Sequence, residues 1–303
     1  MAAPLQGYTD AAWRHFHAEI YGNIDTYFTP FMRVERGEVR MRDIRGITSQ
    51  LNENHTLVPQ IIFRNTDEFE MLVDAVVAEG YDRVDLNLGC PFPPQVKHGR
   101  GAALIVNPSL LKAIGEIISV KYPDVVFSVK MRIGVTNSDE WKTIISELND
   151  ITLSHITIHP RIASQQYAGS LDMEQFAKFM SESVHPIIYN GDLLSIDDVD
   201  SMIVKYPKLS GVMIGRGLLM RPSLSAELKS GKEWDSTSRL DHIMMFHKSL
   251  FDYYSKTLCG EAQILAKIKP FWEYLEQEIG RKTAKVIKKS TSVNKYLSAV
   301  SLI

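Results

Sequence analysis

The sequence predicts an α/β protein, a (β/α)8 TIM barrel of eight parallel strands and their helices, followed by an all-helical domain. Three observations predict this fold. Short, nearly continuous apolar runs recur through the first two-thirds of the 303 residues, amphipathic stretches alternate with these runs, and the runs cease after Pro222. Because strands that are apolar on both faces are typical of a buried parallel sheet, the pattern favours parallel over antiparallel pairing.

The expected strands are runs rich in β-branched and apolar residues, at 2–5, 25–29, 57–63, 83–87, 125–131, 154–158, 186–189 and 211–214. Helices are expected between them at 67–79, 108–121, 138–149, 173–183 and 195–205. Ser138 and Ser195 are predicted N-caps, and Pro108 suits a first helical turn. The arginine-rich connection 29–57 is expected to pass over the barrel mouth. Eight such units fit a closed barrel better than an open sheet.

The last quarter of the chain carries helical patterns only. Amphipathic helices are expected at 240–256, 261–278 and 282–300, and the segment 231–238, rich in Gly, Ser, Thr and Asp, has the composition of a linker. We therefore predict two domains, a catalytic barrel over residues 1–231 and a helical domain over residues 232–303.

Composition narrows the class of protein. Hydrophobic residues make up 45% and charged residues 23%, as in a globular protein with a full core. No apolar run approaches the roughly 18 residues of a bilayer span, and no basic segment precedes an apolar one at the N-terminus, so we expect neither a membrane protein nor a secreted one. Cys90 and Cys259 lie in unlike contexts, which favours free thiols and a cytoplasmic location. Nothing points to an obligate protein partner, and we expect a monomer.

Charge is distributed unevenly. The net charge is −2, which argues against a general nucleic-acid binder, yet residues 239–303 hold 11 Lys and Arg against 6 Asp and Glu. Within this tail, the segment 281–295 contains no acid and six basic residues, namely Arg281, Lys282, Lys285, Lys288, Lys289 and Lys295. Such a face is suited to phosphate groups, and it is equally compatible with a solvated helix surface.

Five consecutive expected strands, the fourth to the eighth, end in polar side chains or glycines. These are Asn87, Gly89 and Cys90; Lys130 and Arg132; His159 and Arg161; Asn190, Gly191 and Asp192; and Gly215 and Arg216. A packed core does not require such groups, and in a parallel barrel the carboxyl ends of all strands open on one mouth. The sequence therefore predicts a functional site there.

The loops after the seventh and eighth strands indicate an anion site. Each carries a glycine and is expected to open a helix, so that backbone N–H groups and a helix N-terminus face the ligand. Arg216 can add a bidentate contact. Because barrels often hold a phosphate at this place, we expect a phosphorylated cofactor.

Three side chains allow more than one interpretation. Lys130 either faces an electron-rich heterocycle or forms a salt bridge to a neighbouring strand end. His159 either contacts a ligand or is a satisfied core histidine. Cys90, between Gly89 and Pro91, lies in a sharp loop rather than in a core strand. A nucleophilic Cys–His pair is an alternative for Cys90, but the predicted phosphate site favours cofactor chemistry.

Two further features surround Cys90. No second cysteine or histidine lies at ligand spacing to it, so no metal site is expected. The loop 92–101 carries Lys97, His98 and Arg100, and we expect it to act as a mobile, basic lid.

Taken with these residues, the sequence resembles the tRNA-dihydrouridine synthases over nearly the whole chain. The resemblance lies in segments 3–10, 85–91, 99–104, 129–132, 159–161, 190–192 and 211–217, with Gln165, Tyr167 and Gly169. The Asn-x-Gly-Cys-Pro piece ahead of a Gly-x-Gly-Ala loop is the most specific part. Segment 267–272 and the region of Arg33 are most similar to the bacterial subfamily that modifies the D-loop around position 16.

The resemblance implies an FMN-binding barrel with a C-terminal helical domain that binds tRNA. It implies FMN contacts from Ala3, Pro4, Gln60, Lys130, His159, Asn190, Gly191, Asp192, Gly215 and Arg216. It implies substrate contacts from Asn87, Arg132, Tyr167 and Arg161. In the implied ping-pong cycle NADPH or NADH reduces FMN, flavin N5 gives a hydride to C6 of a flipped-out uridine, and the Cys90 thiol protonates C5.

Two other functions remain open from the sequence. One is an FMN barrel that acts on a free small molecule, such as a dihydropyrimidine or dihydroorotate dehydrogenase, which needs no basic tail. The other is a non-catalytic RNA-binding module on a barrel scaffold.

Overall fold

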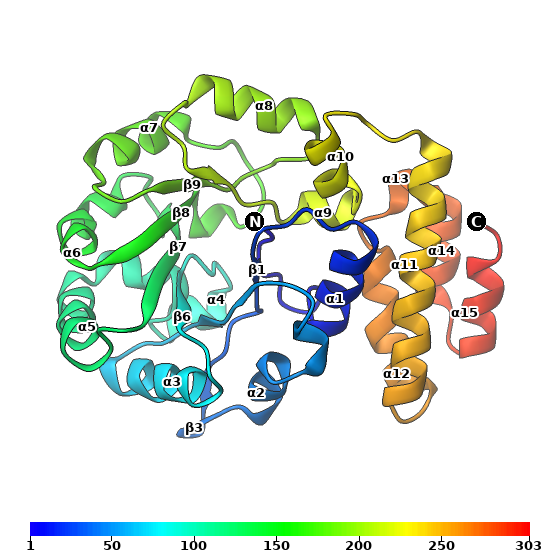
Figure 1. Cartoon of the computed structure of the whole chain (residues 1–303), viewed down its shortest axis with the longest axis horizontal. Helices are drawn as coiled ribbons and strands as arrows, with labels where there is room; N and C mark the ends of the chain where they lie inside the picture. The colour runs from blue at the N-terminus through cyan, green and yellow to red at the C-terminus, as the bar shows by residue number, and fades with distance from the viewer.

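The computed structural model describes all 303 residues, and its centre is a closed ring of parallel strands (Figure 1). Six strands form one sheet in the order β5 (Gln60–Ile61), β6 (Arg83–Leu88), β7 (Val126–Gly134), β8 (Leu153–Ile162), β9 (Ile187–Tyr189) and β10 (Gly211–Val212). A separate parallel pair joins β1 (Tyr27–Phe28) to β4 (Leu57–Val58). All these pairings are parallel, as the apolar runs predicted.

Of the first expected strand, residues 2–5, only Ala2 pairs with other strands, and it closes the ring. Ala2 forms parallel bridges to both Tyr27 and Ile214, and the Ala3 amide donates to the Ile214 carbonyl at 2.8 Å. Pro4 has no N–H to continue this ladder. The predicted barrel is therefore confirmed, although residues 2–5 do not form a regular strand.

The expected strand 57–63 is divided at Pro59. Residues before it pair with β1 as β4, and residues after it pair with β6 as β5. Pro59 lacks a donor, but its carbonyl accepts the Asp85 amide at 2.9 Å, so the ladder continues across the break.

Helices cover the outside of the ring, as expected. They are α1 (Ala11–Ile20), α3 (Thr66–Ala78), α5 (Pro108–Lys121), α6 (Ile145–Asp150), α7 (Met173–Glu182) and α8 (Ile196–Lys205). Ser195 caps α8 in a capping box with Asp198, and Pro108 lies in the first turn of α5. The prediction that Ser138 caps a helix is wrong. The Glu140 carboxylate bonds the Thr136 amide and hydroxyl, which holds the preceding loop, and a 3-10 turn (Glu140–Thr143) comes before α6.

The connection 29–57 forms a small hairpin and a helix beside the mouth. Strands β2 (Val34–Glu35) and β3 (Glu38–Val39) pair antiparallel, and α2 (Met41–Ile47) follows. Arg36 and Gly37, at the turn, both have positive φ, as a two-residue hairpin turn requires. After β6 the chain forms α4 (Pro93–Lys97) and a 3-10 segment (Gly101–Val106), and after β10 it forms α9 (Arg216–Met220) and α10 (Leu224–Ser230).

The C-terminal helices lie at one side of the barrel, next to α1 (Figure 1). They are α11 (Ser236–Thr257), α12 (Glu261–Ile268), a 3-10 turn (Lys269–Trp272), α13 (Glu276–Ile279), α14 (Arg281–Lys289) and α15 (Val293–Val300). Two expected helices are therefore shorter than predicted, because Pro270 and the Ser292 N-cap begin new segments. Phe246 of α11 packs on Trp13 of α1, with ring centroids 5.7 Å apart, in one continuous apolar core. The domain boundary at residues 231 and 232 stays a prediction.

No single helix has the length and apolarity needed to span a membrane. The segments Pro93–Val106 and Pro108–Lys121 reach that length only as a pair, and they meet at 78°.

Candidate active site

A cavity of about 1100 Å³ opens at the carboxyl ends of the strands. Its lining contains every predicted site residue except Arg161, namely Ala3, Pro4, Gln60, Asn87, Cys90, Lys130, Arg132, His159, Tyr167, Asn190, Gly191, Asp192, Gly215 and Arg216. It also contains residues that sequence reasoning did not assign, among them Tyr8, Arg33, Arg40 and Tyr274. The polar strand ends therefore converge on one site.

A chain of hydrogen bonds that ends at a buried carboxyl builds the side of the cavity at β5 and β6. The fully buried Asp85 accepts from the Gln60 amide at 2.7 Å and from the Ser128 hydroxyl at 2.6 Å. The other end of the Gln60 side chain accepts from the Asn87 amide at 2.7 Å. Burial raises the pKa of Asp85 to about 6, against the lowering effect of these bonds. Asp85 and Ser128, for which the sequence predicted no role, thus fix Gln60 and Asn87.

Asn87 in turn holds the loop that carries the thiol. Its side-chain oxygen accepts from the Gly89 amide at 3.0 Å and from the Cys90 amide at 2.8 Å. Gly101 packs against this loop with a φ of +61°, and a Cβ there would lie 2.8 Å from the Cys90 Cβ. Only glycine satisfies both the left-handed backbone and the close approach.

Cys90 is a half-buried, free thiol at the cavity wall. Burial raises its pKa above the ordinary value, and the Phe92 amide, Arg132 and Lys130 oppose that shift. The raised pKa keeps the sulfur protonated at neutral pH, so it is suited to donate a proton and poorly suited to act as a nucleophile.

Lys130 lies beside Asn87 in the β6–β7 register and makes neither a hydrogen bond nor an ion pair. The salt bridge considered from the sequence is therefore not formed. Burial lowers the pKa of Lys130 to about 8, and the nearby Arg132 adds to that effect. A cation without a protein partner fits an electron-rich ligand in the cavity.

His159 is buried among cationic side chains. Burial lowers its pKa well below the ordinary value, and Lys130, Arg132 and other nearby cations lower it further. The imidazole is therefore neutral. Because a guanidinium only donates, the 3.4 Å contact from Arg161 Nη1 makes His159 Nε2 the acceptor and leaves the proton on Nδ1.

The glycine loops after β9 and β10 leave unpaired amides at the cavity. The amides of Gly191 and Gly215 donate no hydrogen bond within the protein, and both residues line the cavity. The expectation that each loop opens a helix at once is only partly right. Helix α8 begins at Ile196 and is capped by Ser195, while α9 is a five-residue helix directly after Gly215. An anion here would meet loop amides and Arg216 rather than the N-terminus of a long helix.

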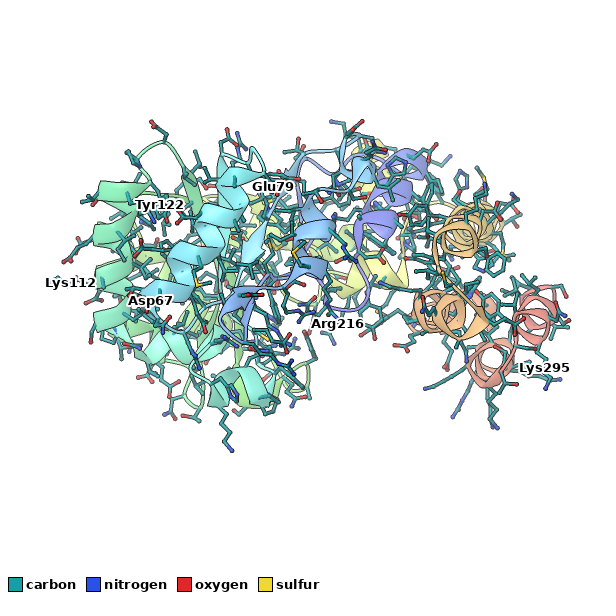
Figure 2. All side chains as sticks on the ribbon, turned by 90° about the horizontal axis from the view of Figure 1, so that it is seen from below. Asp67, Glu79, Lys112, Tyr122, Arg216 and Lys295 are labelled. Atoms are coloured by element: carbon teal, nitrogen blue, oxygen red, sulfur yellow. The ribbon has the colours of Figure 1, made fainter.

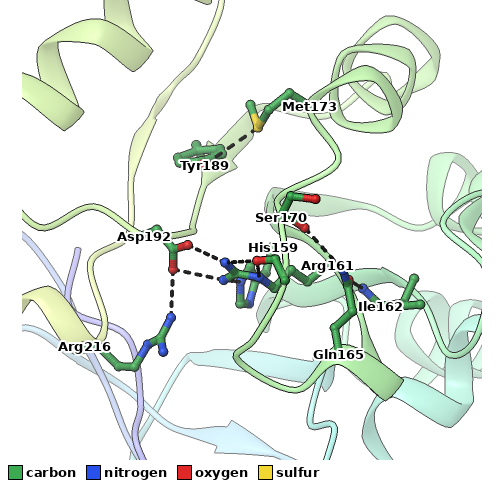
Figure 3. A network of polar contacts seen from close by, with 10 residues as sticks. His159, Arg161, Ile162, Gln165, Ser170, Met173, Tyr189, Asp192 and Arg216 are labelled. Carbon is green, nitrogen blue, oxygen red and sulfur yellow. Dashed lines mark hydrogen bonds and ion pairs between the residues drawn. The ribbon is translucent and has the colours of Figure 1, made fainter.

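Arg161, Asp192 and Arg216 form a charged group next to His159 (Figure 3). Asp192 receives hydrogen bonds from Arg161 on both carboxylate oxygens and from Arg216 at 2.7 Å. The hydrogen bond from Arg161 is the main cause that lowers the pKa of Asp192. Arg161 is buried and does not line the cavity, and its predicted contact with the substrate stays a prediction.

Tyr167 stands at the cavity within reach of two guanidinium groups. Its ring centroid lies 4.8 Å from Arg216 Cζ and 5.5 Å from Arg132 Cζ. Arg132 is itself fixed by a 2.8 Å bond to the Ile162 carbonyl. Tyr167 is 49% exposed as a residue, so part of its surface is available to a ligand.

One residue of the C-terminal region, in the turn before α13, contributes to the cavity as well. Tyr274 lines it and meets the Tyr8 ring edge-on, with centroids 5.3 Å apart, while the Tyr8 hydroxyl donates to Glu273 at 2.5 Å. Nearby, Asp10 accepts from the Tyr254 hydroxyl at 3.0 Å and from Lys267 at 2.9 Å. No sequence signal pointed to Tyr274, because nothing along the chain joins it to a strand end.

Two basic regions differ in how far they are neutralised. In the expected lid, Arg100 is buried in an ion pair with Glu68 at 2.6 Å, so it adds no free charge, and the mobility of that loop stays a prediction. The six basic side chains of segment 281–295 take part in no salt bridge. Figure 2 shows Lys295 of this segment on the outer side of the C-terminal helices.

The mouth of this parallel β/α barrel brings together a thiol, an unpaired lysine, a neutral histidine and free glycine amides. These features define a barrel enzyme with its site at the strand ends. Residues 1–295 match the family described as "Dihydrouridine synthase (Dus)". The chain belongs to the dihydrouridine synthase family and is an oxidoreductase, which confirms the predicted class.

Individual relatives are distant in sequence. The chain is 28% identical over 261 residues to a "Probable tRNA-dihydrouridine synthase" of Staphylococcus aureus (strain N315), with 84% of this chain and 77% of the relative covered. It is 28% identical to "Probable tRNA-dihydrouridine synthase 2" of Bacillus subtilis (strain 168), with 84% and 78% covered.

Solved structures confirm the fold. The old yellow enzyme from Trypanosoma cruzi has a TM-score of 0.55 at 9% identity and covers 77% of this chain and 88% of that one. Morphinone reductase has a TM-score of 0.52 at 10% identity, with 77% and 86% covered.

Proposed function

We propose that this enzyme reduces the C5=C6 bond of a uridine in tRNA to 5,6-dihydrouridine, with FMN as cofactor and NADPH or NADH as reductant. One observation supports it most strongly: a neutral thiol and an unpaired lysine face the same cavity as the free glycine amides. The family supports the product, and the names of the two relatives support tRNA as the substrate.

The residues present fit FMN. The unpaired amides of Gly191 and Gly215, with the Arg216 guanidinium, suit its phosphate. Lys130 brings a positive charge without a protein partner to the ring, where it would stabilise negative charge on the pyrimidine part. The remaining contacts that we assign to FMN come from Ala3, Pro4, Gln60, His159 and Asn190. The chemistry that FMN supplies when bound is hydride transfer to uracil C6.

The Cys90 thiol is the general acid in this proposal and gives its proton to uracil C5. Its raised pKa keeps that proton in place at neutral pH, and the two hydrogen bonds that Asn87 accepts hold its loop against the cavity. We assign uracil contacts to Asn87, Arg132 and Tyr167. Extruding the base from the RNA costs a few kcal/mol, which stacking and these polar contacts offset.

The C-terminal helices are assigned to the tRNA backbone. Segment 281–295 offers six basic side chains that no acid neutralises, and Tyr274 extends the cavity wall toward these helices. Contacts of this kind act through phosphate charge and weaken steeply with added salt. We also assign the enzyme to the subfamily that modifies position 16 of the D-loop.

The central test replaces Cys90 with Ala. We expect dihydrouridine formation on tRNA to fall by about 100-fold or more, because a positioned acid contributes roughly that factor. Flavin absorbance of the purified protein and oxidation of NADPH should persist. Cys259→Ala is the matched control, since Cys259 is free and exposed in the connection between α11 and α12, and it does not line the cavity. A normal rate in Cys90→Ala refutes the acid assignment, and a colourless wild-type protein with no affinity for FMN refutes the proposed function.

The modified position is tested separately. Mass spectrometry of tRNA from cells that lack the gene should show loss of dihydrouridine at position 16. Loss at another uridine would retain the reaction and correct the subfamily.

A further inference from the structure

We propose that Arg161 and Asp192 are positioning residues that hold Tyr167 in place as the substrate-facing wall of the cavity. The inference rests on the proposed function, since the substrate is taken to be a uridine of RNA. It replaces two expectations from the sequence, that Arg161 touches the substrate and that Asp192 touches the cofactor.

Arg161 has no donor left for a ligand. Its Nε and Nη2 donate to the Gly169 carbonyl at 3.2 and 2.9 Å, and Nη2 also bonds Asp192 Oδ2. Its Nη1 donates to Asp192 Oδ1 at 2.9 Å and to His159 Nε2 at 3.4 Å. A guanidinium has five N–H donors, and these five contacts account for all of them. The residue is 3% exposed, and it does not line the cavity.

The carboxylate oxygens of Asp192 likewise accept hydrogen bonds from within the protein. Both of its oxygens accept from Arg161, and Oδ1 also accepts from Arg216 at 2.7 Å (Figure 3). A carboxylate beside a phosphate site repels the phosphate, so a direct contact with the cofactor phosphate would be unfavourable. Its effect on the cavity instead passes through the side chain of Arg216, which it fixes.

Arg161 and Asp192 are each connected to Tyr167 through a chain of contacts. The first runs through the backbone: Tyr167 lies in a tight loop in which Gln166 and Gly169 have positive φ, and Arg161 ties that loop to the barrel through the Gly169 carbonyl. The second runs through Asp192 to Arg216, whose guanidinium lies 4.8 Å from the Tyr167 ring. A half-exposed aromatic ring held from two sides offers a fixed surface for a flat base.

The test is a double-mutant cycle on kcat/KM for tRNA reduction. Arg161→Lys keeps the charge but lacks the planar fork that joins Gly169 to Asp192. We expect it to lower kcat/KM by roughly 10- to 100-fold, mainly through KM, because the charge-assisted bonds that orient the wall are removed. With the enzyme saturated with FMN, so that the contacts of Arg161 with His159 and of Asp192 with Arg216 do not limit turnover, the same change in a Tyr167→Ala background should cost less than about 3-fold, since the residue it positions is already gone. Asp192→Asn should behave in the same way.

A second readout does not require turnover. Hydrogen exchange of residues 163–172 should become faster in Arg161→Lys and should change little in Tyr167→Ala. Arg83→Lys is the matched control, because Arg83 is exposed at the opposite end of β6, and it should leave both readouts unchanged.

The results of these experiments distinguish a failure of the positioning role from a failure of the proposed function. Equal costs of Arg161→Lys with and without the Tyr167 ring, or unchanged exchange in the loop, would overturn the positioning role while uridine reduction stands. A wild-type protein that makes no dihydrouridine overturns the proposed function, and with it the assignment of this wall to a uridine.

Discussion

The two sides of the cavity are built from different interactions. At β5 and β6, neutral amides and one buried carboxyl, Asp85, pass hydrogen bonds from Ser128 to the Cys90 loop. At β7 to β10, the cations Lys130, Arg132, Arg161 and Arg216 surround a neutral histidine and a single carboxylate. The first side fixes a proton donor through a chain of short hydrogen bonds in which Asp85 is the one group that carries charge. The second side concentrates positive charge where a phosphorylated, electron-rich ligand would lie.

This difference predicts that the two sides of the cavity have different functions. Changes on the β5–β6 side should lower the rate of the chemical step, whereas changes on the cationic side should lower affinity and alter the dependence on salt and pH.

The largest effect is expected at the β5–β6 side, from Asn87→Ala. The substitution removes both hydrogen bonds to the Cys90 loop and leaves the buried Gln60 oxygen without its donor. We expect kcat for tRNA reduction to fall by about 100-fold, because the acid is no longer held at the reacting carbon. Single-turnover measurements on the purified flavoprotein check this. If Asn87→Ala changes KM alone, the proposed division between the two sides is wrong.

On the cationic side, we expect kcat/KM to fall by about tenfold per pH unit at alkaline pH. The Lys130 pKa is lowered to about 8, so the ammonium is charged below that pH and neutral above it. If its charge is required, kcat/KM should fall as pH rises through 8. The thiol, with its raised pKa, stays protonated over that range.

Lys130→Arg identifies the group that titrates. A guanidinium stays charged throughout, so the alkaline limb of the pH profile should move upward by more than a unit. A limb that stays at pH 8 in this variant would assign the titration to another group.

A smaller effect, about tenfold on FMN affinity, is expected from Arg216→Lys. Lysine keeps the charge but cannot make the bidentate contact to a phosphate and has no planar group to place beside the Tyr167 ring. Flavin fluorescence titrations measure the dissociation constant, and Arg45→Lys on the exposed face of α2 serves as the control. Undiminished FMN affinity would place the phosphate elsewhere.

The smallest effect per residue is expected at α14. Replacing Lys285, Lys288 and Lys289 with Gln should weaken tRNA binding several-fold and reduce the slope of log K against log salt by about one for each phosphate that is no longer neutralised. Reduction of FMN by NADPH should be unaffected. An unchanged salt slope would remove α14 from the RNA interface.

The sequence anticipated which strand ends carry chemistry, because residues that end parallel strands must share one mouth whatever the details of packing. It did not anticipate partners that come from other segments. Arg161 follows His159 by two residues, and the sequence predicts that both side chains are free to contact a ligand. In the structure the Arg161 guanidinium instead donates its hydrogen bonds to Gly169 and Asp192. The Tyr8–Tyr274 contact joins the two ends of the chain, and no local pattern points to it.

The order of strands and helices, the barrel and the positions of Cys90 and Lys130 were determined by the sequence alone, since apolar periodicity and chain order are local properties. Which groups remain free to meet a ligand was decided only by the tertiary structure. A hydrogen-bond donor can be used once, and whether a neighbour from a distant segment has already used it depends on how the chain folds back on itself.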